Sequence, residues 1–128
     1  MNIMIVDDEP QVAEVLAKSL ARQGHRTTVV HSGEDALRLI GTSPPDALFL
    51  DVSMPGVNGL AVLAEVRRTR PQLAVVVITG HATPDEVEEV KRLGAVDVIP
   101  KPAALTHYHR AIEKLHAKKS VNAVDRSG

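Results

Sequence analysis

The feature that most constrains the fold is an alternation of short apolar runs with segments of helical periodicity. The apolar runs are rich in the valine and isoleucine typical of strands, and they cover residues 2–6, 26–31, 46–50, 73–78 and 95–99. The helical segments that follow them cover residues 10–23, 33–40, 58–69, 84–93 and 104–118. Because parallel strands rejoin a sheet through right-handed helical crossovers, this order predicts an α/β fold with a five-stranded parallel sheet. Five strands are too few for the eight-stranded barrel, so we expect an open, doubly wound sheet.

Local signals mark the ends of the expected helices. Ser32 is a typical N-cap residue, and Thr83 with Glu86 three positions later predicts a capping box. Gly24 and Gly94 are expected to end the helices that precede them. The first helix is expected to bury one apolar face, formed by Val12, Val15, Leu16 and Leu20.

The length of 128 residues is typical of a single domain. We expect that domain to span residues 1–118. The last ten residues, 119–128, are polar and lack a clear period, which indicates a tail or the start of a linker. No further domain-sized segment follows residue 118 in the sequence, so we expect either a stand-alone domain or part of a longer protein.

Charge and composition exclude several classes of function. A net charge of −1 and a pI near 6.6 give no electrostatic reason to expect direct binding to nucleic acid or to an anionic membrane. The chain has no cysteine, so disulfides and thiolate metal sites are excluded. The N-terminus places acids directly after five apolar residues, unlike a signal peptide or a membrane span, and we expect a cytoplasmic protein.

Chemically capable side chains follow the apolar runs at the point where each run stops. Asp7 and Asp8 follow the first run, Asp51 the third, Thr79 the fourth and Lys101 the fifth. Ligands of open α/β sheets bind beyond the carboxyl ends of the strands, where these residues are expected to meet. Three converging aspartates would repel one another unless a cation neutralises them or their pKa values rise. A hard divalent ion with oxygen ligands, Mg²⁺ or alternatively Mn²⁺, is the economical solution. The lysine and the hydroxyl suit phosphate oxygens, so phosphoryl transfer to a carboxylate is the favoured chemistry.

Each of these residues also has an ordinary structural interpretation. Asp8 taken alone is better explained as the cap of the helix that begins at Pro10. Lys101 could be a solvated loop lysine, and Thr79 a hydroxyl satisfied by backbone. At the end of the second run, His31 precedes the Ser32 cap and suggests nothing further. His107 and His109 are two positions apart and therefore favour a surface role over metal binding.

Four sequence blocks, in order, resemble the receiver domain of two-component response regulators. The blocks are "IVDDEP" at 5–10, "LDVSMPGVNGL" at 50–60, "VITGHA" at 77–82 and "GAVDVIPKP" at 94–102. The similarity extends from residue 1 to about residue 118. The resemblance implies the CheY-like form of the flavodoxin-like fold, with the strands in the order 2-1-3-4-5.

The resemblance also implies a role for each site residue. Asp51 would accept a phosphoryl group from a phosphohistidine, and Thr79 and Lys101 would contact that group. Mg²⁺ would be held by Asp7, Asp8, Asp51 and the backbone carbonyl of Ser53. The side chains of Ser53 and His81 would tune the lifetime of the phosphorylated state, and the peptide bond from Lys101 to Pro102 would be cis.

By the same resemblance, the partners would be a sensor histidine kinase or phosphotransfer protein, and a downstream protein or output domain. A homodimer that depends on phosphorylation is a further expectation. Such a domain is a switch that catalyses only its own phosphorylation and dephosphorylation, and so is not an enzyme acting on other substrates.

The sequence departs from the receiver pattern at Val98, where the family commonly has tyrosine or phenylalanine. The sole tyrosine, Tyr108, lies in the last helix and cannot replace that ring directly. We therefore expect a smaller or differently routed switch, with an exposed Val98 as a candidate docking contact.

Three alternative functions compete with the phosphorylated switch. One is a docking module that is never phosphorylated, suggested by Val98 but opposed by the complete set of site residues. Another is an aspartate-nucleophile phosphatase, disfavoured because Ser53 stands where such enzymes need an acid. A flavin-binding domain is weaker still, because no phosphate-binding loop follows the first strand and Asp7 and Asp8 would repel phosphate.

Overall fold

The chain was analysed as a computed structural model, which describes residues 1–54, 58–81, 83–102 and 105–127. The strands are β1 (Asn2–Val6), β2 (Arg26–Val30), β3 (Ala47–Asp51), β4 (Ala74–Thr79) and β5 (Asp97–Pro100). The helices are α1 (Pro10–Arg22), α2 (Gly33–Thr42), α3 (Gly59–Thr69), α4 (Pro84–Arg92) and α5 (Leu105–Ser127). All five strands are parallel, in the order β2-β1-β3-β4-β5, which confirms the predicted fold. The expected helix start at residue 104 lies outside the described residues.

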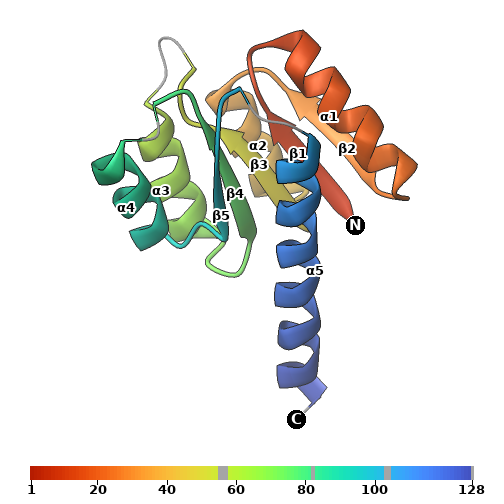
Figure 1. Cartoon of the computed structure of the whole chain (residues 1–128). Coiled ribbons are helices and arrows are strands. Elements are labelled where there is room, and N and C mark those ends of the chain that lie inside the picture. The colour runs from red at the N-terminus through yellow and green to blue at the C-terminus, as the bar shows by residue number, and fades with distance from the viewer. Residues whose placement is uncertain (55–57, 82, 103–104, 128) are drawn as a thin grey trace.

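The sheet is covered by helices on both faces (Figure 1). On one face, α1 and α5 pack against alternate strand residues around Phe49. On the other face, α2, α3 and α4 pack around Leu48 and Leu50. Side chains of successive strand residues point to opposite faces, so a run such as 74–79 must be apolar throughout to serve both layers. The core is almost wholly aliphatic, and its aromatic part is the pair Phe49 and Tyr108, whose ring centroids are 6.3 Å apart.

The register of the sheet brings the carboxyl ends of the strands to one edge. Val6 of β1 lies beside Leu50 of β3, so the residues that follow, Asp7 and Asp51, continue side by side. In β4, Thr79 lies beside Pro100 of β5, directly before Lys101. The expected convergence of the strand ends therefore follows from the pairing of the strands.

The expected helix caps form in most cases. Ser32 Oγ accepts a hydrogen bond from the Asp35 amide at 3.1 Å. Gly24 and Gly94 follow their helices with φ values of 89° and 85°, a conformation that costs glycine little. These two glycines are where the sequence predicted a helix end.

Two helix predictions were wrong. On α1, Ala13 is buried with Leu16 and Leu20, whereas Val15 is 55% exposed and Val12 only partly buried. The stripe facing the sheet is centred one residue further along the helix than hydrophobicity alone indicates. In addition, the α5 backbone does not end at residue 118 but stays helical to Ser127. The assignment of 119–128 to a tail or linker remains a prediction.

Arg67 of α3 connects three elements by hydrogen bonds at the edge of the sheet opposite the strands' carboxyl ends. Its guanidinium donates to the carbonyl of Leu93 at 3.0 Å, to those of Pro71 and Leu73 at 2.9 Å, and to that of Gly94 at 3.4 Å. These bonds join the end of α3, the start of β4 and the end of α4. Burial lowers the pKa of Arg67 from its ordinary value.

At the other end of α3, Gly59 lies against the loop that leaves β3. A Cβ at position 59 would be 2.3 Å from Val52 Cα and 2.5 Å from Val52 O. The helix can approach this closely only because residue 59 has no side chain. Val52 follows Asp51 directly, so this contact helps to fix the backbone at the end of β3.

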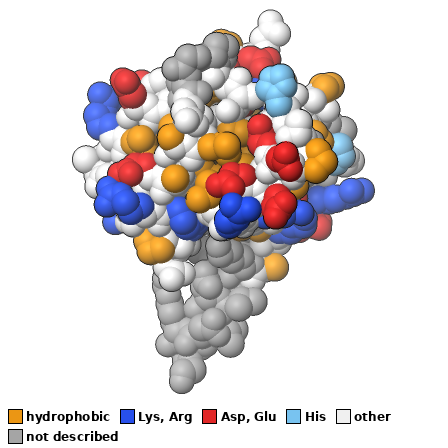
Figure 2. All heavy atoms as spheres, turned by 90° about the vertical axis from the view of Figure 1, so that its left-hand side faces the viewer, with side chains coloured by type: hydrophobic (Ala, Val, Ile, Leu, Met, Phe, Trp, Pro, Cys, Tyr) orange, Lys and Arg blue, Asp and Glu red, His pale blue; other side chains and the backbone are white. Residues whose placement is uncertain are grey.

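The face that α3 and α4 present to solvent mixes acidic and basic side chains with hydrophobic ones (Figure 2). On α4, Arg92 pairs with Glu89 at 2.9 Å and lies 3.7 Å from Glu88. Within the described part of the chain, no helix combines the length and the hydropathy needed to cross a membrane.

Candidate functional site

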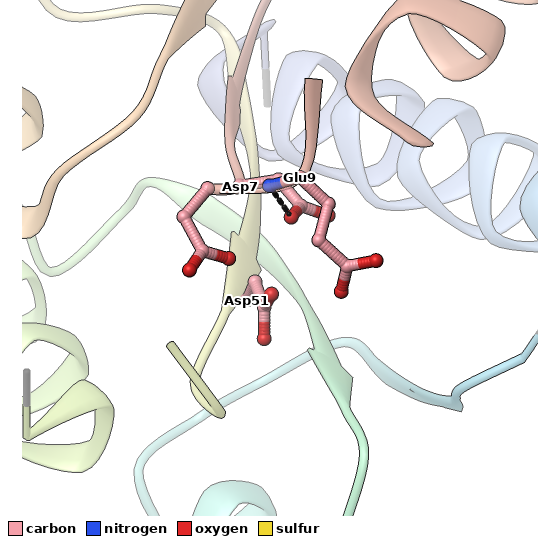
Figure 3. A group of neighbouring side chains, drawn as sticks. Asp7, Glu9 and Asp51 are labelled. Atoms are coloured by element: carbon pink, nitrogen blue, oxygen red, sulfur yellow. Dashed lines mark hydrogen bonds between the residues drawn. The ribbon is translucent and has the colours of Figure 1, made fainter. Parts of the chain in front are cut away.

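Four carboxylates gather at the carboxyl edge of the sheet. They belong to Asp7, Asp8 and Glu9, directly after β1, and to Asp51, the last residue of β3. Figure 3 shows the side chains of Asp7, Glu9 and Asp51. One oxygen from each lies within 4.8 Å of the others. Asp7 and Asp51 are buried, at 0% and 1% exposure, whereas Asp8 and Glu9 are exposed. The sequence predicted that the three aspartates meet, and it did not predict Glu9.

Lys101 faces this cluster from the end of β5. Its Nζ lies 2.7 Å from Asp51 Oδ2, 2.8 Å from Glu9 Oε1 and 3.3 Å from Asp7 Oδ2. Burial lowers the pKa of the ammonium group, but hydrogen bonds to Asp51 and Glu9 outweigh burial and raise that pKa above its ordinary value. Lys101 is therefore a fixed cation between three carboxylates. The peptide bond that follows it, Lys101–Pro102, is cis.

The other oxygen of Asp51 is held by Ser53. Asp51 Oδ1 accepts a hydrogen bond from the Ser53 amide at 2.8 Å and from Ser53 Oγ at 2.7 Å. Ser53 Oγ in turn accepts from the Gly80 amide at 3.2 Å. The Ser53 hydroxyl thus links the loops that follow β3 and β4 across the site.

Thr79, at the end of β4, is only 1% exposed. Its Oγ1 accepts a hydrogen bond from the His81 amide at 3.0 Å and donates one to Glu86 Oε1. The interpretation of Thr79 as a hydroxyl satisfied by backbone alone is therefore incomplete. Glu86, in the first turn of α4, was predicted only as a capping residue.

The donors present fit a hard divalent cation. All are oxygens, the type of ligand that Mg²⁺ prefers. Among the described residues, Asp7 Oδ2 is buried and receives no hydrogen bond, although Lys101 Nζ lies 3.3 Å away at ion-pair distance. Burial raises the pKa of Asp7, the charge of Asp51 adds to the rise, and the Glu9 amide opposes it. A bound cation stabilises the charged form of a buried carboxylate whose pKa is raised in this way.

Replacing Asp7 by asparagine is expected to stabilise the metal-free protein at pH 7 by roughly 1–3 kcal/mol, because a neutral amide avoids the desolvation penalty of a buried charge and the repulsion from Asp51. A raised pKa means that the charged form is penalised in the folded state, so the penalty grows as pH rises above the unfolded value of about 3.9. The advantage of Asp7→Asn should therefore shrink as the pH is lowered toward 4. Urea unfolding at several pH values measures it.

Mg²⁺ provides the control for this experiment. Mg²⁺ should stabilise the wild-type protein more than it stabilises the Asp7→Asn variant. The difference between their free energies of unfolding should therefore become smaller. A variant that is less stable than wild type in metal-free buffer at pH 7 would contradict the account.

Several other predicted residues can be placed. Asp8 does not cap α1, because the N-cap residue is Glu9 and it makes no side-chain cap. Val98 is not exposed as expected but half-buried against the core beneath α4. His107 and His109 are exposed, in agreement with a surface role, and His109 Nε2 shares a hydrogen bond with Ser19 at 3.0 Å.

His31 is closer to the site than the sequence indicated. Its Nδ1 donates to the Asp7 carbonyl at 2.9 Å. A signal was available, because His31 directly follows β2, the strand next to β1. Glu9 also had one, as a third acid directly after the aspartate pair. His81 is exposed and contributes its amide to Thr79.

Comparisons with known sequences and structures agree on one protein family. A sequence profile described as the response regulator receiver domain matches residues 3–113. Response regulator MprA of Mycobacterium avium is 40% identical over 105 residues, which is 82% of this chain and 46% of that protein. The DNA-binding transcriptional regulator NtrC of Escherichia coli is 31% identical over 130 residues, covering 98% of this chain and 28% of that protein.

The crystal structure of NtrX from Brucella abortus superimposes with a TM-score of 0.86 and 33% sequence identity, over 97% of this chain and 29% of that one. The chain therefore spans less than half the length of these three proteins.

Proposed function

Because the chain belongs to the family of response regulator receiver domains, we propose that it is a phosphorylation switch in which Asp51 accepts a phosphoryl group. The donor is the phosphohistidine of a sensor histidine kinase or a phosphotransfer protein in the cytoplasm. One observation carries the proposal: the buried Asp51 carboxylate lies 2.7 Å from Lys101 and belongs to an acidic cluster whose oxygens lie within 4.8 Å of one another.

In the proposed reaction, a carboxylate oxygen of Asp51 attacks the phosphorus atom. The new O–P bond forms as the N–P bond to the donor imidazole breaks, and the imidazole leaves with the electron pair. Lys101 holds its positive charge beside the Asp51 carboxylate and so offsets the negative charge of the incoming phosphoryl oxygens. Hydrolysis of the acyl phosphate later returns Asp51 and releases inorganic phosphate.

Asp7, Asp8 and Asp51, with the backbone carbonyl of Ser53, would hold Mg²⁺, and Mn²⁺ is the alternative ion. When bound, the ion neutralises negative charge on the phosphoryl oxygens. Glu9 is ion-paired to Lys101 and completes the acidic rim. Thr79 would donate its hydroxyl proton to a phosphoryl oxygen, and Ser53 and His81 flank the site where they tune hydrolysis.

Downstream, the surface formed by α4, β5 and α5 would carry the signal to a separate protein, to an output domain or to a second copy in a phosphorylation-dependent homodimer. Receiver domains of this family are signalling switches rather than enzymes that act on other substrates. The relative NtrC is named as a DNA-binding regulator, and this chain matches 28% of it. We infer that any contact with DNA belongs to a part outside the receiver fold.

The proposal is tested by intact mass after incubation with acetyl phosphate, with and without Mg²⁺. We expect a Mg²⁺-dependent gain of one phosphoryl group that is absent in Asp51→Asn. Asp46→Asn, at the other end of β3, is the matched control and should behave as wild type. If Mg²⁺ produces no adduct and beryllofluoride does not bind either, the chain is an unphosphorylated docking module and the proposal fails.

A further inference from the structure

The Thr79 hydroxyl is fully engaged in the unphosphorylated structure. Its single proton goes to Glu86 Oε1, and its oxygen accepts from the His81 amide at 3.0 Å. A hydroxyl has only one proton to donate. Thr79 can therefore bond a phosphoryl oxygen only after its bond to Glu86 has broken.

Glu86 reaches Thr79 because its carboxylate is not used in the helix cap. A complete capping box would direct the Glu86 side chain back to the Thr83 amide. Here Thr83 Oγ1 accepts from the Glu86 amide at 3.2 Å, but the Thr83 amide donates instead to the His81 carbonyl at 2.8 Å. Only half of the box forms, and the half-buried Glu86 carboxylate extends toward the end of β4.

We propose that Glu86 is a positioning residue that holds Thr79 in its unphosphorylated orientation and links the site to α4. This inference rests on the proposed function. A carboxylate is a strong acceptor for a hydroxyl and competes directly with the phosphoryl oxygens for the same proton. When the phosphoryl group takes that proton, the first turn of α4 loses its side-chain bond to the end of β4.

This route can replace the aromatic ring that the chain lacks. Val98 is half-buried against the core beneath α4, and its side chain has no polar atom to respond to Thr79. Glu86 lies on α4 itself and contacts Thr79 directly. A movement of the Thr79 side chain therefore changes a contact of α4 directly, with no intervening residue.

The test measures the affinity for beryllofluoride, a mimic of the phosphoryl group, in saturating Mg²⁺. Removing the competitor by Glu86→Ala should tighten binding about tenfold, because a hydrogen bond to a charged group contributes at least that ratio. The matched control is Glu88→Ala, which removes the same charge from an exposed position of the same helix and should change the affinity less than about twofold.

A double-mutant cycle separates this mechanism from simple charge repulsion. In a Thr79→Ala background the effect of Glu86→Ala should disappear, because no hydroxyl remains to be released. An equal tightening with and without Thr79, or an equal tightening by Glu88→Ala, would show that charge alone acts and would overturn the proposal. So would an unchanged affinity in Glu86→Ala.

The amide resonance of His81 gives a second measurement, because this amide donates to Thr79 Oγ1. In metal-free Glu86→Ala it should shift toward its position in the beryllofluoride complex, and in Glu88→Ala it should stay at the wild-type position. Failure of wild type to bind beryllofluoride at all would instead reject the proposed function.

Discussion

Gly59→Ala is expected to destabilise the fold by about 3 kcal/mol, the upper part of the range for overpacking. The added methyl would lie 2.3 Å from Val52 Cα and 2.6 Å from Val52 Cβ, far inside contact distance. The obstacle is backbone, which cannot rotate away as a side chain can. Either α3 moves off the sheet or the chain after β3 moves, and both disturb packing around Leu63.

Urea unfolding followed by helical circular dichroism measures this loss, since the chain has no tryptophan to report it. Gly41→Ala is the matched control, because a Cβ there meets nothing within 4 Å. Gly41 lies in the last turn of α2, so that change should stabilise by less than the roughly 1 kcal/mol that separates glycine from alanine in a helix interior. Equal midpoints for the two variants would contradict the packing argument.

The second large effect concerns phosphoryl acceptance. Lys101→Met should slow phosphorylation by acetyl phosphate about 100-fold, the scale for removing one preorganised charge-stabilising donor. Methionine keeps the length and much of the apolar volume of the side chain but leaves Asp51, Asp7 and Glu9 without the ammonium group that contacts all three. Intact mass against time gives the rate.

Lys18→Met is the control for a lost lysine charge, because Lys18 is exposed on α1 and pairs only with Glu14 at 2.9 Å among the described contacts. Exposed pairs of this kind contribute little, so its rate should match wild type. If Lys101→Met is phosphorylated at a rate within twofold of wild type, the proposed role of this lysine in the reaction is wrong.

The convergence of the site could be predicted because it depends on topology alone. Parallel strands end at one edge of the sheet, so Asp7, Asp51 and Lys101 had to meet once the strands were assigned. No assumption about rotamers was needed. The same reasoning located Thr79 correctly at the end of β4.

The contacts that could not be predicted are those made by long, flexible side chains. Glu9 and Glu86 each have flexible side chains with several available partners, and sequence spacing does not choose among them. For Glu86, spacing predicted the Thr83 amide, whereas the structure has the Thr79 hydroxyl. On α1, hydrophobicity ranked Val15 above Ala13, but helix rotation relative to the sheet placed the smaller residue inside.

The two ends of α4 are held very differently. At its last turn, Arg67 donates to the carbonyls of Leu93 and Gly94 and, through the same guanidinium, to the start of β4. At its first turn, Glu86 alone reaches the sheet by a side-chain hydrogen bond among the described contacts. Local unfolding of the helix should therefore begin at its N-terminal turn, so that backbone amides there exchange with solvent far sooner than those near Leu93.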